Sequence, residues 1–149
     1  MDDLKELLEL LNRHEVEFLI IGAHAVAKYG YPRATKDIDV WIRKELETAT
    51  RVAAALKEFG ADIGEAGINE LAGPKNRMVR FGVAPNMVDI LNFTDFGDFE
   101  EIWQGRVEGQ FIDVQVHFPS KAALIEMKRR SGRPQDLVDI QKLEETLPD

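Results

Sequence analysis

The segment KDIDVWI contains two aspartates, Asp37 and Asp39, separated by one isoleucine. Successive side chains of a β-strand alternate between its faces, so both carboxylates would leave the same face. Two carboxylates this close repel each other. A divalent cation such as Mg²⁺, which prefers carboxylate oxygens and shares them with substrate phosphates, would relieve the repulsion. The spacing alone supports equally well a simpler interpretation, in which one aspartate is a turn or cap residue and the other is exposed to solvent.

A glycine one strand earlier is the second chemical signal. The apolar run VEFLII predicts a buried strand that stops at Gly22, and a short helix is predicted to follow from Ala23. Helix N-termini offer unpaired N–H groups to phosphate, and a glycine lets phosphate approach the backbone closely. A plain strand-to-helix turn would look the same. Together with the aspartate pair, however, the pattern indicates one element for a triphosphate and another for its metal.

Hydrophobic periodicity predicts the elements that must position these residues. We expect one α/β or α+β domain with a mixed sheet, since helices and strands alternate and two hairpins follow. The second hairpin is expected to turn near Gly109, and the glycine-rich segment 61–76 to be a mobile loop that lines the site. The predicted order is helix 2–14, strand 16–21, helix 23–30, strand 36–42, a helix ending at Gly60, hairpins within 77–93 and 106–118, a helix capped by Ser120 and stopped by Gly132, and a helix opened by Pro134 with Leu137, Ile140, Leu143 and Leu147 on one side.

Composition narrows the class of protein. The 149 residues are 44% hydrophobic and 31% charged, which is ordinary for a globular domain. No apolar run approaches the roughly 18 residues of a membrane helix, so a cytoplasmic protein without membrane contact is the default expectation. The chain has no cysteine, which excludes zinc–thiolate sites, and its three histidines lack ligand spacing. A net charge of −8 argues against nucleic-acid binding by the whole surface.

The order of glycine, small residue, short helix and Asp-x-Asp resembles the nucleotidyltransferase superfamily, which includes DNA polymerase beta and the kanamycin nucleotidyltransferases. The stretch GAHAVAKYGYPRATKDIDVWI is particularly similar to small stand-alone prokaryotic members of the abortive-infection and toxin–antitoxin types, and LIEMKRRSGRPQDLVDIQKLE is similar to their C-terminal segment. The resemblance implies a nucleotidyltransferase-like mixed β-sheet flanked by helices, as a single domain over 1–149 with extra C-terminal helices at about 120–147.

The resemblance also implies roles for single residues. Gly22 matches the glycine that contacts nucleotide phosphates, and Ala23 stands where the family commonly has serine or glycine. Asp37 and Asp39 match the metal-binding pair, which holds Mg²⁺ or Mn²⁺. A third carboxylate on a later strand activates the attacking hydroxyl.

Two aspartates compete for this third place. Asp89 lies within an apolar strand, where an unpaired charge is costly. Asp113 would lie on the polar face of an alternating strand, where solvent explains it. Burial and family order favour Asp89 as the third catalytic and metal-binding carboxylate. The alternative is that Asp89 pairs with an arginine, either Arg77 or Arg80.

Further nucleotide contacts are expected from the loop before the aspartates and from the C-terminal helices. Arg33 and Thr35 precede Asp37, and Arg33 could clamp a phosphate through two hydrogen bonds or only orient the aspartate. Lys128 matches a family lysine near the nucleotide, but it could also be a surface residue. Asp136 and Asp139 are expected to complement a helix dipole.

The resemblance implies transfer of a nucleoside monophosphate from a nucleoside triphosphate to a hydroxyl acceptor, with release of pyrophosphate. The acceptor could be a protein side chain or the end of a tRNA, whose phosphates the cluster Lys121, Lys128, Arg129, Arg130 and Arg133 could contact. A small-molecule acceptor is the third choice, because such enzymes generally have a larger second domain. The alternative is a catalytically inactive nucleotide-binding or partner-binding module of a toxin–antitoxin or defence system. Oligomeric state and base preference stay open.

Overall fold

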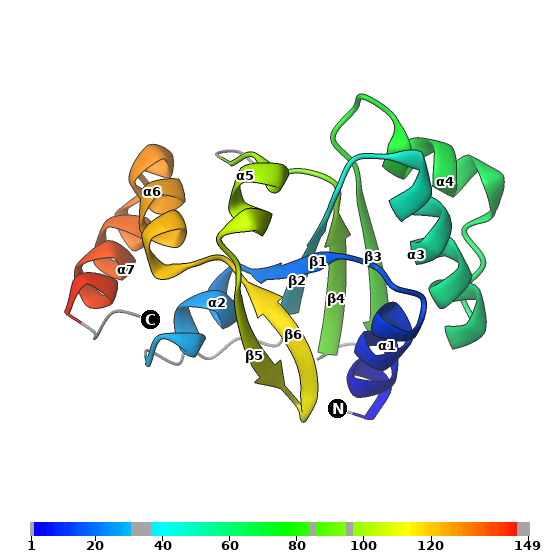
Figure 1. Ribbon diagram of the computed structural model, residues 1–149, viewed down its shortest axis with the longest axis horizontal. Coiled ribbons are helices and arrows are strands. Elements are labelled where there is room, and N and C mark those ends of the chain that lie inside the picture. The colour runs from blue at the N-terminus through cyan, green and yellow to red at the C-terminus, as the bar shows by residue number, and fades with distance from the viewer. Residues whose placement is uncertain (1, 31–36, 84–85, 95–96, 146–149) are drawn as a thin grey trace.

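Helices pack on both sides of a central mixed sheet in the computed structural model, which describes residues 2–30, 37–83, 86–94 and 97–145 (Figure 1). Within these ranges it has seven helices and six strands. The elements are α1 (Asp2–Arg13), β1 (Phe18–Ile21), α2 (Ala23–Lys28), β2 (Asp37–Ile42), α3 (Leu46–Phe59), α4 (Gly64–Ala72), β3 (Met78–Val83), β4 (Asn86–Leu91), α5 (Phe99–Gln104), β5 (Val107–Phe111), β6 (Val114–Phe118), α6 (Lys121–Ser131) and α7 (Pro134–Glu144).

The four-stranded sheet has the order β1-β2-β4-β3. Strand β2 runs antiparallel to β1 but parallel to β4, and β3 returns antiparallel beside β4. The sheet is therefore mixed, and β3 forms one of its edges. Strands β5 and β6 form a separate hairpin next to β1 and α1. This arrangement confirms the expected mixed sheet flanked by helices.

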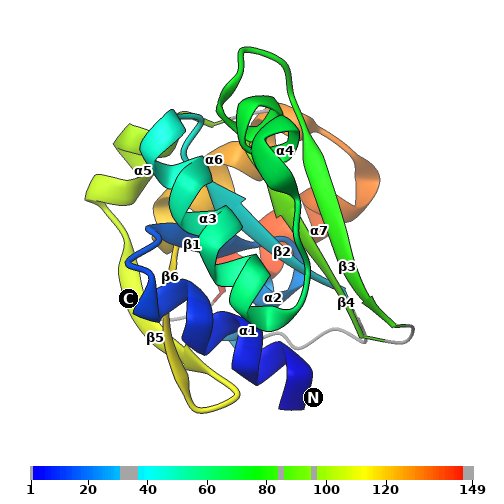
Figure 2. The same cartoon turned by 90° about the vertical axis from the view of Figure 1, so that its right-hand side faces the viewer.

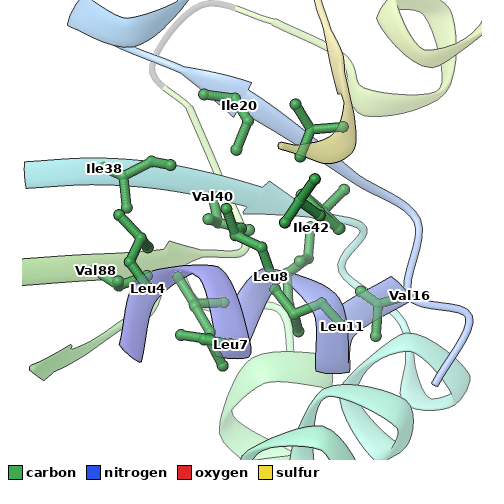
Figure 3. Packing of buried hydrophobic residues seen from close by; sticks show 14 of the residues in the cluster. Leu4, Leu7, Leu8, Leu11, Val16, Ile20, Ile38, Val40, Ile42 and Val88 are labelled. Carbon is green, nitrogen blue, oxygen red and sulfur yellow. The ribbon is translucent and has the colours of Figure 1, made fainter. Parts of the chain in front are cut away.

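The main core fills the side of the sheet that faces α1 and α3. Figure 2 shows these helices in front of the sheet and α6 and α7 behind it. Ile38, Val40 and Ile42 alternate along β2 and are fully buried against leucines of α1 such as Leu8 and Leu11 (Figure 3). Because strand side chains alternate, Asp37, Asp39 and Trp41 must leave the opposite face.

A smaller apolar cluster covers part of that opposite face. Trp41 packs edge-on against Phe99 of α5, and Leu19 and Trp103 belong to the same cluster. Met127 of α6 packs against it and is only partly buried. The aspartates of β2 thus lie on the same face of the sheet as this apolar cluster, which is also the side where α6 and α7 lie (Figure 2).

Three sequence expectations are wrong. Segment 61–76 is not an open loop, because Gly64–Ala72 forms α4 and buries Leu71 completely. The second hairpin turns at Ile112 and Asp113, both with positive φ, rather than near Gly109, which pairs with Val116. Leu137 of α7 is 56% exposed, since α7 turns its buried side elsewhere.

The ends of the last two helices follow their sequence signals. The Ser120 side chain accepts a hydrogen bond from the Ala123 N–H at 3.1 Å, which confirms the expected cap of α6. Gly132 ends α6 with a φ of 67°, and Pro134 opens α7. In the part of the chain that the structure describes, no helix is long and apolar enough to span a membrane.

Candidate active site

Two carboxylates from neighbouring parallel strands meet on the open face of the sheet. Asp39 of β2 lies opposite Asp89 of β4 in the strand register, so both side chains leave the same face. Asp89 is 5% exposed and Asp39 is half-buried. Asp37 lies two residues earlier on the same strand, at its exposed end. Because β2 pairs with β4 in this register, all three candidate carboxylates leave the same face of the sheet.

The charge state of Asp39 reflects this crowding. Burial raises the pKa of its carboxyl group to about 6, and the charges of Asp89 and Asp37 and a hydrogen bond with Asp89 act in the same direction. The guanidinium of Arg80 opposes the rise only in part. Ionised Asp39 is thus destabilised by its surroundings, which is a feature common at functional sites. A cation between these carboxylates would remove the repulsion.

Arg80 pairs with Asp89 through both of its carboxylate oxygens. Arg80 lies on β3 directly opposite Asp89, and its Nε and Nη2 donate hydrogen bonds to Oδ1 at 2.6 Å and to Oδ2 at 2.9 Å. The carboxylate side chain is 7% exposed and the arginine side chain 50%. Of the two arginines considered as partners of Asp89, Arg80 is the one found, because Arg77 pairs with Glu70. Asp89 is therefore both ion-paired and adjacent to Asp39.

Gly22 lies directly against Asp39. Its φ of 74° and ψ of −149° fall in a region that is essentially restricted to glycine. A Cβ atom at this position would come within 2.6 Å of Asp39 Oδ2. The glycine is thus required both by the backbone conformation and by the close approach of the carboxylate. Ala23 follows as the first residue of α2, which has only six residues.

A pocket of about 340 Å³ opens in front of Asp39. Its sheet side includes Ile21, Gly22 and Asp39, and its other side is formed by α6 and α7, with Lys128 among the lining residues. Residues from early and late segments of the chain therefore line one cavity. Figure 1 shows α6 and α7 on the same side of the molecule as α2. This volume suits a small ligand.

Lys128 is ion-paired within the helical wall. Its Nζ lies 3.2 Å from an oxygen of Asp136 and 3.0 Å from one of Asp139, and both acids are buried. Burial would raise the pKa of Asp136, but hydrogen bonds from Ser131, Arg133 and Lys128 outweigh it and lower the pKa to about 2. The two aspartates therefore neutralise a lysine in addition to lying early in α7, which the helix-dipole interpretation did not foresee.

The remaining sequence candidates are placed differently. Arg33 and Thr35 lie outside the described residues. Asp113 is an exposed turn residue of the β5–β6 hairpin, in a different sheet from Asp39. The basic run of α6 is mostly paired with acids, for example Arg129 with Glu126 and Glu144. The arginines of α6 stay exposed, so the ion pairs reduce the net positive charge of this surface without burying it.

Sequence reasoning missed two contributors to the site. His24 of α2 makes a hydrogen bond to the backbone of Asp37, while burial keeps the pKa of its imidazole below the usual value. Its edge packs against Phe111. Thr94, after β4, lines the pocket, and its hydroxyl is buried without a hydrogen-bond partner within the described part of the chain. No pattern of residue spacing in the sequence marks His24 or Thr94, because their positions at the site depend on tertiary structure.

A divalent cation fits the carboxylates, although no complete cage is preformed. Across the described ranges, no three His, Cys, Asp or Glu side chains already surround one point. Asp39 and Asp89 nevertheless supply hard oxygen donors within hydrogen-bond reach of each other, and burial together with the charge of Asp89 raises the pKa of Asp39. Mg²⁺ characteristically uses one or two carboxylates and takes further oxygens from substrate phosphates and water. The donor set matches this pattern.

The comparisons with known proteins agree with the geometry. A family model described as "Nucleotidyltransferase of unknown function (DUF6036)" matches residues 1–146. No protein with a curated description matches the chain. The fold is similar to the crystal structure of ANT(2'')-Ia in complex with adenylyl-2''-tobramycin, with a TM-score of 0.55 and 15% sequence identity, over 94% of this chain and 84% of that one. At this identity the likeness shows the fold.

Proposed function

The chain belongs to this family of nucleotidyltransferases of unknown function, and from that premise we propose that it is a metal-dependent enzyme that transfers a nucleoside monophosphate from a nucleoside triphosphate to a hydroxyl group. The observation that carries the proposal is the pairing of Asp39 with Asp89 beside Gly22 at the wall of a pocket. The domain spans residues 1–149, and the reaction takes place in the cytoplasm, where nucleoside triphosphates are abundant.

The carboxylates have distinct roles in this proposal. Asp37, Asp39 and Asp89 would hold Mg²⁺ or Mn²⁺, which would neutralise charge on the triphosphate and on the attacking and leaving oxygens. Asp89 would accept the proton of the acceptor hydroxyl. The acceptor oxygen then forms a bond to the α-phosphorus, the bond from that phosphorus to the bridging oxygen breaks, and pyrophosphate leaves.

The nucleotide would occupy the pocket between the sheet and the C-terminal helices. Gly22 and Ala23 would lie against its phosphates, because the absence of a side chain at Gly22 keeps the backbone open beside Asp39. Lys128 would face it from α6, with its charge shared among Asp136, Asp139 and the ligand. Arg33 and Thr35 remain candidates for phosphate contacts from the preceding loop.

Three classes of molecule are candidates for the hydroxyl acceptor. A protein side chain or the end of a tRNA remains a candidate acceptor, as in nucleotidyltransferases of the toxin–antitoxin type. The paired state of the basic residues in α6 gives RNA less support than the sequence did. A small-molecule hydroxyl gains support, since this chain matches 84% of ANT(2'')-Ia, whose structure holds adenylyl-2''-tobramycin. The size argument against a small acceptor is correspondingly weaker.

Labelled transfer tests the proposal. The protein is incubated with each α-³²P-labelled nucleoside triphosphate, Mg²⁺ and one of three acceptor pools: aminoglycosides, total tRNA or cell-extract proteins. We expect label in one pool, with one pyrophosphate released per transfer, and none after chelation by EDTA. Tight nucleotide binding without transfer in any pool would instead favour the inactive nucleotide-binding module.

A further inference from the structure

Arg80 has an unusual position for a residue that pairs with a buried acid. It lies on β3, the edge strand beside β4, and half of its side chain is exposed. Figures 1 and 2 show β3 at the margin of the sheet. Its guanidinium nevertheless holds both oxygens of the buried Asp89 carboxylate. The two planar groups therefore form the bidentate geometry in which arginine binds carboxylates most strongly.

The same carboxylate is the neighbour of Asp39. A divalent ion held by Asp39 and Asp89 would have to share Asp89 with a cation that is already in place. Like charges disfavour each other, so the guanidinium must weaken the binding of a metal ion nearby. It also fixes the rotamer of Asp89, since both oxygens are engaged. Lys128 has no equivalent effect, because its own two acids neutralise it on the helical wall.

We propose that Arg80 is a positioning residue that serves as a built-in counter-cation for Asp89 and keeps the affinity of the nucleotide-free site for divalent ions low. Metal then binds well only when the nucleotide adds its phosphates, which supply the negative charge that Arg80 offsets. This inference rests on the proposed metal-binding role of the carboxylates. It adds Arg80 of β3 to the proposed active site. It also adds an order of binding, in which the metal ion and the nucleotide bind together.

Replacement of Arg80 by a neutral residue should strengthen metal binding. Without Arg80, Asp39 and Asp89 present their full negative charge to a metal ion. Asp89 also becomes free to rotate, but the Coulomb attraction between the ion and the carboxylates outweighs the entropy lost when that side chain is fixed again. A merely structural salt bridge predicts the reverse, because loss of its partner would only disorder Asp89. The two explanations therefore differ in the sign of the effect on metal affinity.

The experiment measures Mn²⁺ binding to nucleotide-free protein by electron paramagnetic resonance. We expect Arg80→Gln to bind Mn²⁺ at least tenfold more tightly than the parent. Arg77→Gln is the matched control, since Arg77 precedes the same strand and its loss changes the net charge equally, but it pairs with Glu70. It should stay within about twofold of the parent. Equal or weaker binding by Arg80→Gln, or an equal gain in Arg77→Gln, would overturn the proposal.

Two further variants show whether the effect acts through Asp89. In an Asp89→Asn background, Arg80→Gln should gain clearly less Mn²⁺ affinity than in the parent background, because only the longer-range charge interaction of Arg80 with Asp37 and Asp39 is then removed, and a full gain there would contradict the mechanism. Arg80→Lys keeps the charge and should stay within about threefold of the parent; a gain like that of Arg80→Gln would contradict it too. Circular dichroism verifies folding, and the neutral variant Arg80→Met, with the same expected gain, replaces Arg80→Gln if that variant does not fold.

Failure of this inference can be told apart from failure of the proposed function. Mg²⁺-dependent ATP binding by the parent tests the function without reference to Arg80. If the parent binds ATP with Mg²⁺ but Arg80→Gln gains no metal affinity, only the role of Arg80 is wrong. If the parent binds neither ATP nor Mn²⁺ and Arg80→Gln gains nothing, both are wrong.

Discussion

Asp39 and Asp136 line opposite walls of the same pocket, and each belongs to a group of buried acids whose electrostatics differ from those of the other group. On the sheet side, Arg80 forms an ion pair with Asp89 and only partly offsets the rise of the pKa of Asp39 to about 6. On the helical side, Asp136 and Asp139 surround Lys128, and the pKa of Asp136 is lowered to about 2. Both groups contain buried carboxylates, yet only the helical group has its charge well compensated.

The difference separates a structural site from a functional one. Buried acids that are matched by cations and hydrogen bonds stabilise the fold or at least do not strain it. Buried acids crowded together without sufficient cations are destabilising until a ligand supplies positive charge. Substitutions on the sheet side should therefore affect chemistry more than stability, and those on the helical side should affect stability first.

The largest expected effect is on transfer by Asp89→Asn. Loss of a general base typically lowers the rate by about 100- to 10,000-fold, and the altered metal site adds to this loss. Nucleotide binding should largely survive, because Asp37 and Asp39 remain. Single-turnover transfer or pyrophosphate release measures the effect. Asp113→Asn, in the exposed hairpin turn, is the control and should be nearly silent; an inactive Asp113→Asn with an active Asp89→Asn would reverse the assignment.

On the helical side, Lys128→Met should destabilise the fold. It would leave Asp136 and the fully buried Asp139 without their shared cation. Breaking a buried ion pair by removing one partner costs about 3–5 kcal/mol. Guanidinium unfolding gives the difference in the free energy of unfolding. Arg130→Met, which removes an exposed ion pair with Glu126, is the matched control and should cost less than about 1 kcal/mol. Equal stability of Lys128→Met and the parent would refute the comparison.

Gly22→Ala should affect both stability and the sheet-side site. The strained backbone costs on the order of 1–3 kcal/mol, and the new methyl group would collide with Asp39. Gly60→Ala separates the two effects. Gly60 also has a positive φ, of 113°, but a Cβ there would meet nothing within 4 Å. Both variants should melt at lower temperature, and only Gly22→Ala should lose Mg²⁺-dependent ATP binding. Retained binding in Gly22→Ala would show that Asp39 tolerates displacement.

The smallest expected effect is on the pH dependence of stability. Ionisation of Asp136 should raise the free energy of unfolding, whereas ionisation of Asp39 should lower it. The folded pKa of Asp136 is about 2, below its ordinary value of 3.8, so its stabilising contribution is complete above pH 3.8 and is lost as the pH falls toward 2. The folded pKa of Asp39 is about 6, above 3.8, so its ionisation lowers stability as the pH rises from 3.8 to 6.

Unfolding in EDTA across pH 2–7 checks these signs. Asp136→Asn should remove part of the loss of stability on acidification, an effect of about 2 kcal/mol. Asp39→Asn should remove part of the loss between pH 4 and pH 6. The same direction of change in both variants would show that the two walls do not differ electrostatically.

Local signals predicted much of the fold. Ser120, Gly132 and Pro134 act through their own backbone neighbourhood, so their positions at helix ends could be read from the sequence. Segment 61–76 misled the prediction, because its glycines suggested a loop, whereas burial of Leu71 stabilises α4. The hairpin turn was also hidden, since Ile112 and Asp113 adopt positive φ without a glycine.

The three aspartates of the candidate site could be picked out from the sequence, but their arrangement relative to one another could not. The spacing of Asp37 and Asp39 gave their shared face. The position of Asp89 opposite Asp39, however, depends on the parallel pairing of β2 with β4, which local periodicity does not specify. The bond from Arg80 to Asp89 depends on the register of β3 in the same way.

Calorimetric titration of ATP in the presence of Mg²⁺ tests the central claim, that Asp39 and its neighbours form a metal-dependent nucleotide site. The parent and Asp39→Asn are titrated side by side, each with Mg²⁺ and with EDTA, after circular dichroism has shown that both are folded. We expect one ATP to bind per parent chain with Mg²⁺, no measurable binding with EDTA, and none to Asp39→Asn in either buffer. Binding of ATP to Asp39→Asn as tightly as to the parent, or equal binding by the parent with and without Mg²⁺, would contradict the account.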